Sequence, residues 1–385
     1  MKLVKLIPLI LAVLFMVQAA PLAAETSKTF LLVTPKDGYL RDLGQQARQG
    51  AETALKIWGG GFNLEVVEES GEGGEDVNLG QVAAVMGYFS ENRFRADAPR
   101  YLYLKKPVLL PYLTNRQAAA AGPLTFFSLM PTIADQGRFM AMEILTMKKR
   151  PSRILIIVGE EGEQSQLVEA LTATLAEPVQ EPVPVAEPGK KAPKAPAKIR
   201  PLDTRSTKVV TISKSQAMSP DEVTDFGKSN PDLIILAVGI KEAFELAPVL
   251  AESKWAKSPM WSGIFLAFRE TGAAFASLKL RLNVCLPVPS PLNDDRNRAL
   301  RDFKSRYVAE WRTQPTWISA MAYDSVNILI KAASAGESPE AFLTYLTTEN
   351  HHSLGAYELS PGWGEGGAYP LSMMPVRAET LGYLP

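Results

Sequence analysis

The sequence predicts an α/β protein built from doubly wound, Rossmann-like units. Short apolar runs alternate with longer amphipathic stretches, and uninterrupted apolar runs are typical of strands buried on both faces of a parallel sheet. Helices placed between such strands cover both faces of the sheet. The chain has 385 residues, a length that indicates about two domains rather than a single core.

The two kinds of segment follow one another along most of the chain. Strands are predicted at 29–34, 63–67, 82–86, 107–111, 153–158, 232–238, 259–262 and 282–286. Helices are predicted at 43–57, 135–147, 241–252, 295–311, 317–335 and, from a proline at its first position, 339–346. Gly59, Gly60 and Gly61 follow a predicted helix and not a strand, so we expect them to end that helix rather than to bind a phosphate.

The first 24 residues have the pattern of a signal peptide that is removed on export. Lys2 and Lys5 precede an apolar run at 6–17, and a segment of small residues ends at Ala24. A transmembrane anchor needs about 20 apolar residues, and this run is shorter and is followed by no basic cluster. No cysteine near the cleavage site offers a point for lipid attachment. We therefore expect a periplasmic protein without a lipid anchor.

Composition argues against several classes of partner. The chain carries 41 basic and 41 acidic residues, and this absence of net charge disfavours both nucleic acid, which needs many phosphate contacts, and a charged membrane surface. Cys285 is the only cysteine, so no internal disulfide is possible, and its apolar strand predicts a buried, inert thiol. Residues 177–208 are rich in Pro, Ala and Lys, which predicts an extended, disordered insertion in lobe 2, either a surface loop or a tether for a partner.

The sequence contains no motif typical of catalysis or metal binding. His351 and His352 are adjacent, so they do not converge on one metal, and we expect both in an exposed loop. The Gly-x-Ser-x-Gly pattern of a nucleophilic serine is missing. The acidic pair Glu68–Glu69 is expected to be solvated. We predict no cofactor, no metal and no catalytic residue, and an enzyme is the least favoured class of protein.

The candidate site consists of the residues that directly follow the predicted strands, because ligands of open α/β sheets bind outside the carboxyl ends of the strands. These segments are 35–39, 87–90, 112–115, 159–163, 238–239 and 262–265. They are rich in aromatic, hydroxyl-bearing and glycine residues. Such a lining suits a small, partly apolar molecule and offers no acid–base pair.

Several short motifs carry a resemblance to a known family. They are Pro35–Tyr39 with Gly44-Gln45, Met86–Ser90, Pro111–Asn115, Phe127–Pro131, Asp135–Arg138, Phe303–Tyr307 and Ala322–Asp324. In this order they resemble the type I periplasmic binding proteins of ABC importers, in particular the branched-chain amino-acid-binding (leucine-binding) family. The resemblance covers nearly the whole mature chain, and its specificity lies in the order and spacing of the motifs rather than in any one of them.

The resemblance implies two lobes joined by three crossings of the chain. Lobe 1 would contain residues 28–147 and 287–350, and lobe 2 would contain residues 148–286 and 351–385. The lobes would close on a hinge around a small ligand, and the closed form would dock on the permease subunits of the importer in the inner membrane. The protein would be a monomer.

The resemblance also implies site residues. In the family, a serine and a threonine hold the carboxylate of the ligand, and by position these are Ser90 and Thr114, helped by the backbone of Tyr112 and Leu113. Together with the other residues that follow strands, the predicted ligand-binding set is Tyr39, Phe89, Ser90, Tyr112, Leu113, Thr114, Glu161, Gly239 and Phe265.

The sequence departs from the family pattern at three places, one of which is Gly71–Gln81, a shortened segment where the family has a full helix. Residues 159–163 lack the tyrosine of the family, and residues 262–264 lack its acidic residue, which pairs with the ammonium group of an amino acid. An ordinary α-amino acid is therefore disfavoured, and the bulk of Tyr112, Leu113 and Phe265 favours a larger or more apolar solute. Two alternatives stay open: these aromatic rings simply fill the cleft, or the fold serves a periplasmic sensor or scaffold that docks a protein.

Overall fold

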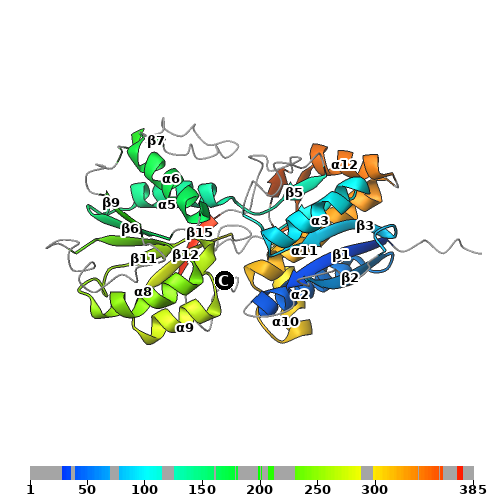
Figure 1. Cartoon of the computed structure of the whole chain (residues 1–385). Coiled ribbons are helices and arrows are strands. Elements are labelled where there is room, and N and C mark those ends of the chain that lie inside the picture. The colour runs from blue at the N-terminus through cyan, green and yellow to red at the C-terminus, as the bar shows by residue number, and fades with distance from the viewer. Residues whose placement is uncertain are drawn as a thin grey trace, which may run out of the picture.

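The computed structural model describes residues 28–35, 40–69, 78–114, 125–159, 162–177, 179–180, 198–199, 201, 207–211, 230–287, 298–336, 338–354, 356–358 and 371–375. These residues form two α/β lobes, each built on its own sheet (Figure 1). The predicted signal peptide at 1–24 and two predicted site residues, Tyr39 and Glu161, lie outside the described residues. Among the described helices, none combines the length and the apolar character that crossing a membrane requires.

Lobe 1 is built on a five-stranded sheet in the order β2-β1-β3-β4-β5, and every pair of neighbours is parallel. The strands are β1 (Lys28–Pro35), β2 (Phe62–Glu69), β3 (Val82–Gly87), β4 (Val108–Leu110) and β5 (Phe126–Ser128). The helices are α2 (Arg41–Trp58), α3 (Glu91–Tyr103), α10 (Arg298–Trp311), α11 (Trp317–Ala335) and α12 (Pro339–Thr348).

Alternate residues of the lobe 1 strands face two different helix layers. Phe30 and Leu32 of β1 belong to the apolar cluster that contains the buried residues of α2 and α11. Leu31 and Val33 belong to a second cluster, which contains Phe94 of α3. The strands are therefore buried on both faces, which is the arrangement that the uninterrupted apolar runs predict.

Lobe 2 is built on a six-stranded sheet in the order β15-β12-β11-β10-β6-β9, parallel except for the antiparallel edge strand β15. The strands are β6 (Ile154–Val158), β9 (Thr207–Thr211), β10 (Leu233–Ala237), β11 (Met260–Ser262), β12 (Leu282–Pro287) and β15 (Leu371–Pro375). The helices are α5 (Ile133–Thr146), α6 (Gly162–Ala176), α8 (Ile240–Glu252) and α9 (Arg269–Ser277), with the short 3-10 helix η3 (Ile264–Leu266).

The predicted boundary of lobe 1 at residue 147 is wrong, because α5 belongs to lobe 2. The buried residues of α5, among them Met140 and Ile144, share a cluster with Ile156 of β6 and Leu171 of α6. The two helices approach so closely at Gly137 that an added Cβ would lie 2.3 Å from the Leu167 carbonyl oxygen. The first crossing therefore lies between β5 and α5, at residues 129–132.

The predicted return to lobe 2 at residue 351 is also too early. The backbone N–H of Leu354 donates to the Asp324 carboxylate of α11 at 2.9 Å, and the His351 ring Nε2 lies 3.0 Å from the Leu346 carbonyl oxygen of α12. β13 (Asn350–His352) and β14 (Ala356–Glu358) thus continue lobe 1. β12 and β15 pair in lobe 2, and the elements between them, α10 to β14, belong to lobe 1. The chain therefore crosses between the lobes after β5, after β12 and before β15, which makes the three predicted crossings.

Several local predictions meet a direct test. Gly59 ends α2 with a φ of +82°, and its N–H bonds to the Leu55 carbonyl, which confirms the predicted helix end. Cys285 is buried, and burial raises the pKa of its thiol. His351 is 2% exposed, so its predicted exposure is wrong, whereas His352 is exposed as expected.

The predicted insertion at 177–208 contains short strands at its described ends. β7 (Val179–Gln180) pairs antiparallel with β8 (Lys198–Ile199), and β9 begins at residue 207, one residue before the predicted end of the insertion. Residues 181–197 lie outside the described part of the chain, so the predicted disorder there is not tested.

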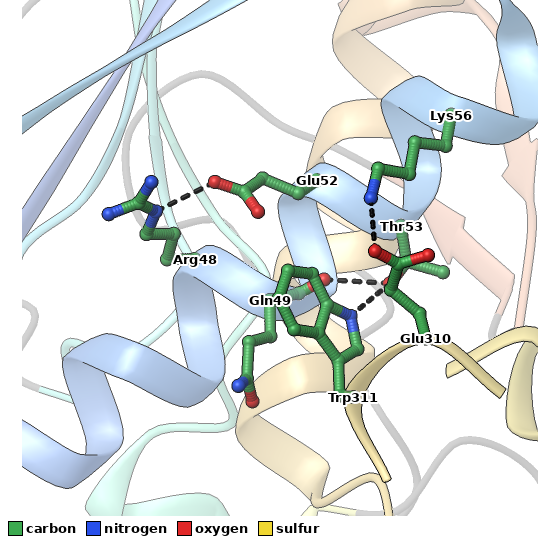
Figure 2. Close-up of polar contacts among 7 residues, drawn as sticks. All are labelled: Arg48, Gln49, Glu52, Thr53, Lys56, Glu310 and Trp311. Atoms are coloured by element: carbon green, nitrogen blue, oxygen red, sulfur yellow. Dashed lines mark hydrogen bonds and ion pairs between the residues drawn. The ribbon is translucent and has the colours of Figure 1, made fainter. Parts of the chain in front are cut away.

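A polar contact layer joins α2 to α10 in lobe 1 (Figure 2). The Trp311 indole N–H donates to the Thr53 hydroxyl at 3.0 Å, and that hydroxyl donates to the Gln49 carbonyl at 2.7 Å. Lys56 forms an ion pair with Glu310 beside them. Thr53 is buried, so its hydroxyl is the element of this layer that water cannot replace.

Replacing Thr53 with valine, a side chain of the same shape, is expected to lower the free energy of unfolding by about 1–2 kcal/mol, because the indole N–H of Trp311 loses its acceptor. Urea titration followed by tryptophan fluorescence measures this change. The control is Arg48→Gln, which removes an exposed i,i+4 ion pair with Glu52 and should cost less than about 0.5 kcal/mol. Equal effects of the two substitutions would contradict this role for Thr53.

Candidate functional site

A strained turn shapes the carboxyl edge of the lobe 1 sheet. Gly87 has a φ of +113°, and an added Cβ there would lie 2.2 Å from the Val33 carbonyl oxygen, so only glycine fits. Tyr88 has a φ of +65°, a conformation that costs a non-glycine residue about 1–3 kcal/mol. Its buried hydroxyl donates to the Asp97 carboxylate at 2.9 Å and contacts the Tyr101 hydroxyl, and these contacts hold the turn.

The turn directs two backbone N–H groups at a carboxylate of the same chain. The N–H of Phe89 and the N–H of Ser90 bond to Glu69 Oε1 at 2.7 and 3.3 Å. The Ser90 hydroxyl caps α3 by accepting from the Arg93 N–H at 3.3 Å. The positive end of the α3 dipole therefore already faces an anion.

Glu69 was expected to be solvated together with Glu68, and this expectation is wrong for Glu69. The structure leaves Glu68 exposed and places Glu69 half-buried at the start of α3. Burial raises the pKa of Glu69, although the two backbone N–H groups and Arg93 act in the opposite direction. The sequence offered only a weak signal for this contact. Glu69 is an acidic residue at the end of a strand, and the Phe89 N–H that it accepts from lies 20 residues later in the chain.

Aromatic rings lie beside this turn. Phe89 stacks on Tyr112 with ring centroids 4.2 Å apart, and Tyr112 meets Trp317 edge to face at 6.5 Å. The Tyr112 hydroxyl donates to the Ile318 carbonyl at 3.2 Å, so the ring is fixed against the start of α11. Sequence analysis did not identify Trp317 as a site residue, because it follows no strand and only the fold places it here.

The other predicted residues of lobe 1 have different surroundings. Leu113 is buried in the cluster between the sheet and α3, which makes it part of the core. Thr114 is half-buried and is the last described residue before 125. The structure thus brings Phe89, Ser90 and Tyr112 together and places Leu113 beneath them.

In lobe 2, the predicted residues Gly239 and Phe265 also follow parallel strands. The Gly239 N–H donates to Glu242 Oε2 at 2.7 Å at the start of α8. An added Cβ at Gly159 would lie 2.4 Å from the same carboxylate oxygen, so the ends of β6 and β10 meet there. Phe265 lies in η3 and is half-buried.

The start of α5 adds a residue that sequence analysis did not include in the site. The Gln136 side-chain oxygen accepts from the Ile264 N–H at 2.9 Å, next to Phe265. Gln136 is fully buried, and its side-chain N–H₂ group has no hydrogen-bond partner among the described residues. Within the same part of the chain, no group of three His, Cys, Asp or Glu residues could hold a metal ion.

Solved structures with the same architecture bind small molecules. The chain is similar to the branched-chain amino acid transporter substrate-binding protein LivJ from Streptococcus pneumoniae in complex with isoleucine, at 13% identity and a TM-score of 0.64, over 90% of this chain and 99% of that one. It is similar to the leucine-binding protein LivK from Thermotoga maritima at 15% identity and a TM-score of 0.64, over 91% and 99%.

A third similar structure binds a different compound. It is an ABC transporter solute-binding protein from R. palustris in complex with benzoate, at 13% identity and a TM-score of 0.59, over 92% of this chain and 99% of that one. No protein-family model and no curated protein matches the sequence. At these identities the comparisons establish the fold, and they cover both lobes.

Proposed function

We propose that this chain, which has the type I periplasmic binding protein fold, is the substrate-binding protein of an ABC-type importer. It captures a small, partly apolar or aromatic solute between its lobes and delivers it to the permease subunits in the inner membrane. The proposal includes export to the periplasm through cleavage of residues 1–24, and a monomeric protein that binds its solute without transforming it.

One observation carries the proposal. Phe89 of lobe 1 and Phe265 of lobe 2 are half-buried rings that follow parallel strands in different lobes, and both pack on a single apolar cluster that contains residues of both lobes. Ligands of parallel sheets bind outside the carboxyl ends of the strands, which is where both rings lie. Rotation of one lobe against the other would open and close the space at these rings.

The proposed roles of Phe89, Ser90 and Leu113 follow from their contacts, and those of Tyr39, Thr114 and Glu161 follow from their positions after predicted strands. Phe89 supplies an aromatic surface that the buried ring of Tyr112 holds rigid by stacking, and Phe265 supplies the facing apolar contact from lobe 2. Thr114 supplies a hydrogen bond to the solute, and Tyr39, Glu161 and Gly239 complete the site from the remaining loops. Ser90 and Leu113 support it, because the Ser90 hydroxyl caps α3 and Leu113 packs in the core.

Glu69 adds a restriction on the chemistry of the solute. The named solutes of similar structures, isoleucine and benzoate, carry a carboxylate. Here the N–H groups at the start of α3 already hold a carboxylate of the protein, and a second one beside it would be repelled. We expect the group of the solute that faces α3 to be uncharged or cationic.

A thermal-shift screen of residues 25–385 against amino acids, aromatic acids, aromatic amines and neutral aromatic compounds tests the proposal. A solute that binds only the native state stabilises it by about 2.7 kcal/mol at a hundredfold excess over Kd. Phe89→Ala should lower the affinity for the solute found by about tenfold or more, because it removes the aromatic surface. Phe244→Ala, at an exposed ring on α8, is the matched control and should leave the affinity unchanged.

Two outcomes would overturn the proposal. One is that no class of compound stabilises the folded protein, which would favour a scaffold that docks a protein partner. The other is that Phe89→Ala and Phe244→Ala affect binding equally, which would place the solute elsewhere.

A further inference from the structure

A second hollow lies at the opposite edge of the lobe 1 sheet. It is a cavity of about 590 Å³, bordered by the first residues of β1, the turns that lead into β3 and β4, and the start of α12. Because the strands of this sheet are parallel, their starts share the edge away from Phe89 and Tyr112. We call this hollow the basal cavity. Its volume is in the range of sites for small organic ligands.

The basal cavity is lined by three lysines and, among its described lining residues, by no acidic side chain. Lys106 Nζ donates to the Val82 carbonyl at 2.6 Å, and Lys28 Nζ donates to the Ala333 carbonyl. Carbonyl oxygens satisfy these donors but do not balance their charge. Burial lowers the pKa of Lys106, which reflects the cost of keeping its ammonium group partly out of water.

Apolar residues also line the basal cavity. Phe342 of α12 is buried, and Leu104, which is 38% exposed, directly precedes Lys105 in the turn after α3. Ser338 caps α12 through the Ala341 N–H at 3.1 Å, so the positive end of that helix dipole adds to the field of the lysines. Lysine ammonium groups beside apolar side chains favour amphiphilic molecules that carry a negative group.

We propose that the basal cavity binds a small organic anion that carries one acidic group on an apolar body. The acidic group contacts the ammonium groups of Lys28 and Lys106, and the apolar body lies against Phe342 and Leu104. This site is separate from the proposed solute site, with which it shares no residue.

Fluorescence titration with 8-anilinonaphthalene-1-sulfonate, an aromatic sulfonate, tests the proposal on residues 25–385. Saturable binding at one site is expected, with affinity falling as salt rises because the contact is ionic. The neutral compound N-phenyl-1-naphthylamine should bind at least about tenfold more weakly, since it lacks the charged group. Equal affinity for the two probes would overturn the proposal, because it would indicate an apolar patch only.

Variants locate the bound anion. Lys106→Gln and Lys28→Gln should each weaken sulfonate binding by about tenfold, since each removes one charge from the contact. Lys105→Asn removes the charge of the third lining lysine. Asparagine tolerates the φ of +51° at this exposed position, so the substitution disturbs no buried contact. Lys148→Gln, an exposed lysine of lobe 2, is the control.

The same titration separates this site from the solute site. Phe89→Ala should leave sulfonate binding unchanged even where it abolishes solute binding. Loss of sulfonate binding in Phe89→Ala, or unchanged affinity in all three variants of the lining lysines, would refute the basal cavity as the site.

Discussion

Replacing Gly50 with alanine is expected to lower the free energy of unfolding by about 3 kcal/mol or more. Gly50 lies in α2 where the start of α11 crosses it, and an added Cβ would lie 2.0 Å from the Ser319 carbonyl oxygen and 2.7 Å from its carbon. The clash is with backbone, so no side-chain rotation relieves it. Ser319 is itself held by a capping box with Thr316, whose hydroxyl donates to Gln46 of α2 at 2.6 Å.

Urea titration of the variant and of Gly60→Ala measures this effect. Gly60 is exposed, lies just after α2, and has no atom within 4 Å of an added Cβ, so its substitution should change stability by less than about 0.5 kcal/mol. If Gly50→Ala unfolded at the same urea concentration as Gly60→Ala, the close approach of α2 and α11 would not exist in solution.

The second large effect is expected at Glu69, and it rests on the proposed function. Glu69→Gln keeps an oxygen that can accept from the N–H groups of Phe89 and Ser90 but removes the negative charge. A like charge about 4 Å away opposes binding by up to about 4 kcal/mol at the effective dielectric of a protein surface. We therefore expect Glu69→Gln to raise the affinity for benzoate and leucine by at least about tenfold, measured by calorimetry.

Glu68→Gln is the matched control, because Glu68 is the exposed neighbour on the same strand. It should leave carboxylate binding unchanged. An equal gain in both variants would point to long-range charge rather than to the carboxylate at the start of α3. If neither variant gained affinity for carboxylates, Glu69 would not be the group that disfavours them. That result would not exclude the binding of a neutral solute.

The raised pKa of Glu69 also predicts a pH dependence with a definite sign. The folded protein holds this proton to higher pH than the unfolded chain, whose carboxyl titrates near its ordinary value of 4.5. Glu69 therefore contributes stability that is complete below the unfolded value and is lost as pH rises through the folded value. Glu69→Gln should lack this loss, so its stability relative to the parent protein should rise with pH above 4.5.

The main architecture was predictable because burial on both faces leaves a plain signal in each central strand. α3 was not predicted, since its buried face consists of only Phe94, Ala98 and Tyr101 in an otherwise polar segment that contains Pro99. The lobe of α5 was predicted wrongly for another reason: its apolar face shows that it packs, but not on which neighbour. Its contact with α6 depends on backbone approach at Gly137.

The candidate site was predictable only in part. The rule that ligands bind beyond the carboxyl ends of strands led to Phe89 and Tyr112, and the structure stacks them. It could not reveal that Glu69 would reach the start of α3, because a hydrogen bond across 20 residues leaves no periodic pattern. His351 was predicted wrongly for a different reason: it packs on the end of the preceding helix, through the Leu346 carbonyl and the Tyr345 ring, which a pair of adjacent histidines does not reveal.

The three crossings also constrain the order in which the protein can fold. The Trp58 indole N–H donates to the Asn327 side-chain oxygen at 2.6 Å, a contact between residues 269 positions apart. The edge strand β15 closes the lobe 2 sheet only when residues 371–375 are present. Neither lobe is therefore a contiguous fragment that can complete its core early in synthesis. Folding that depends on such distant contacts is slow, so we expect the newly made chain to stay unfolded for longer than a chain of the same length whose contacts are local.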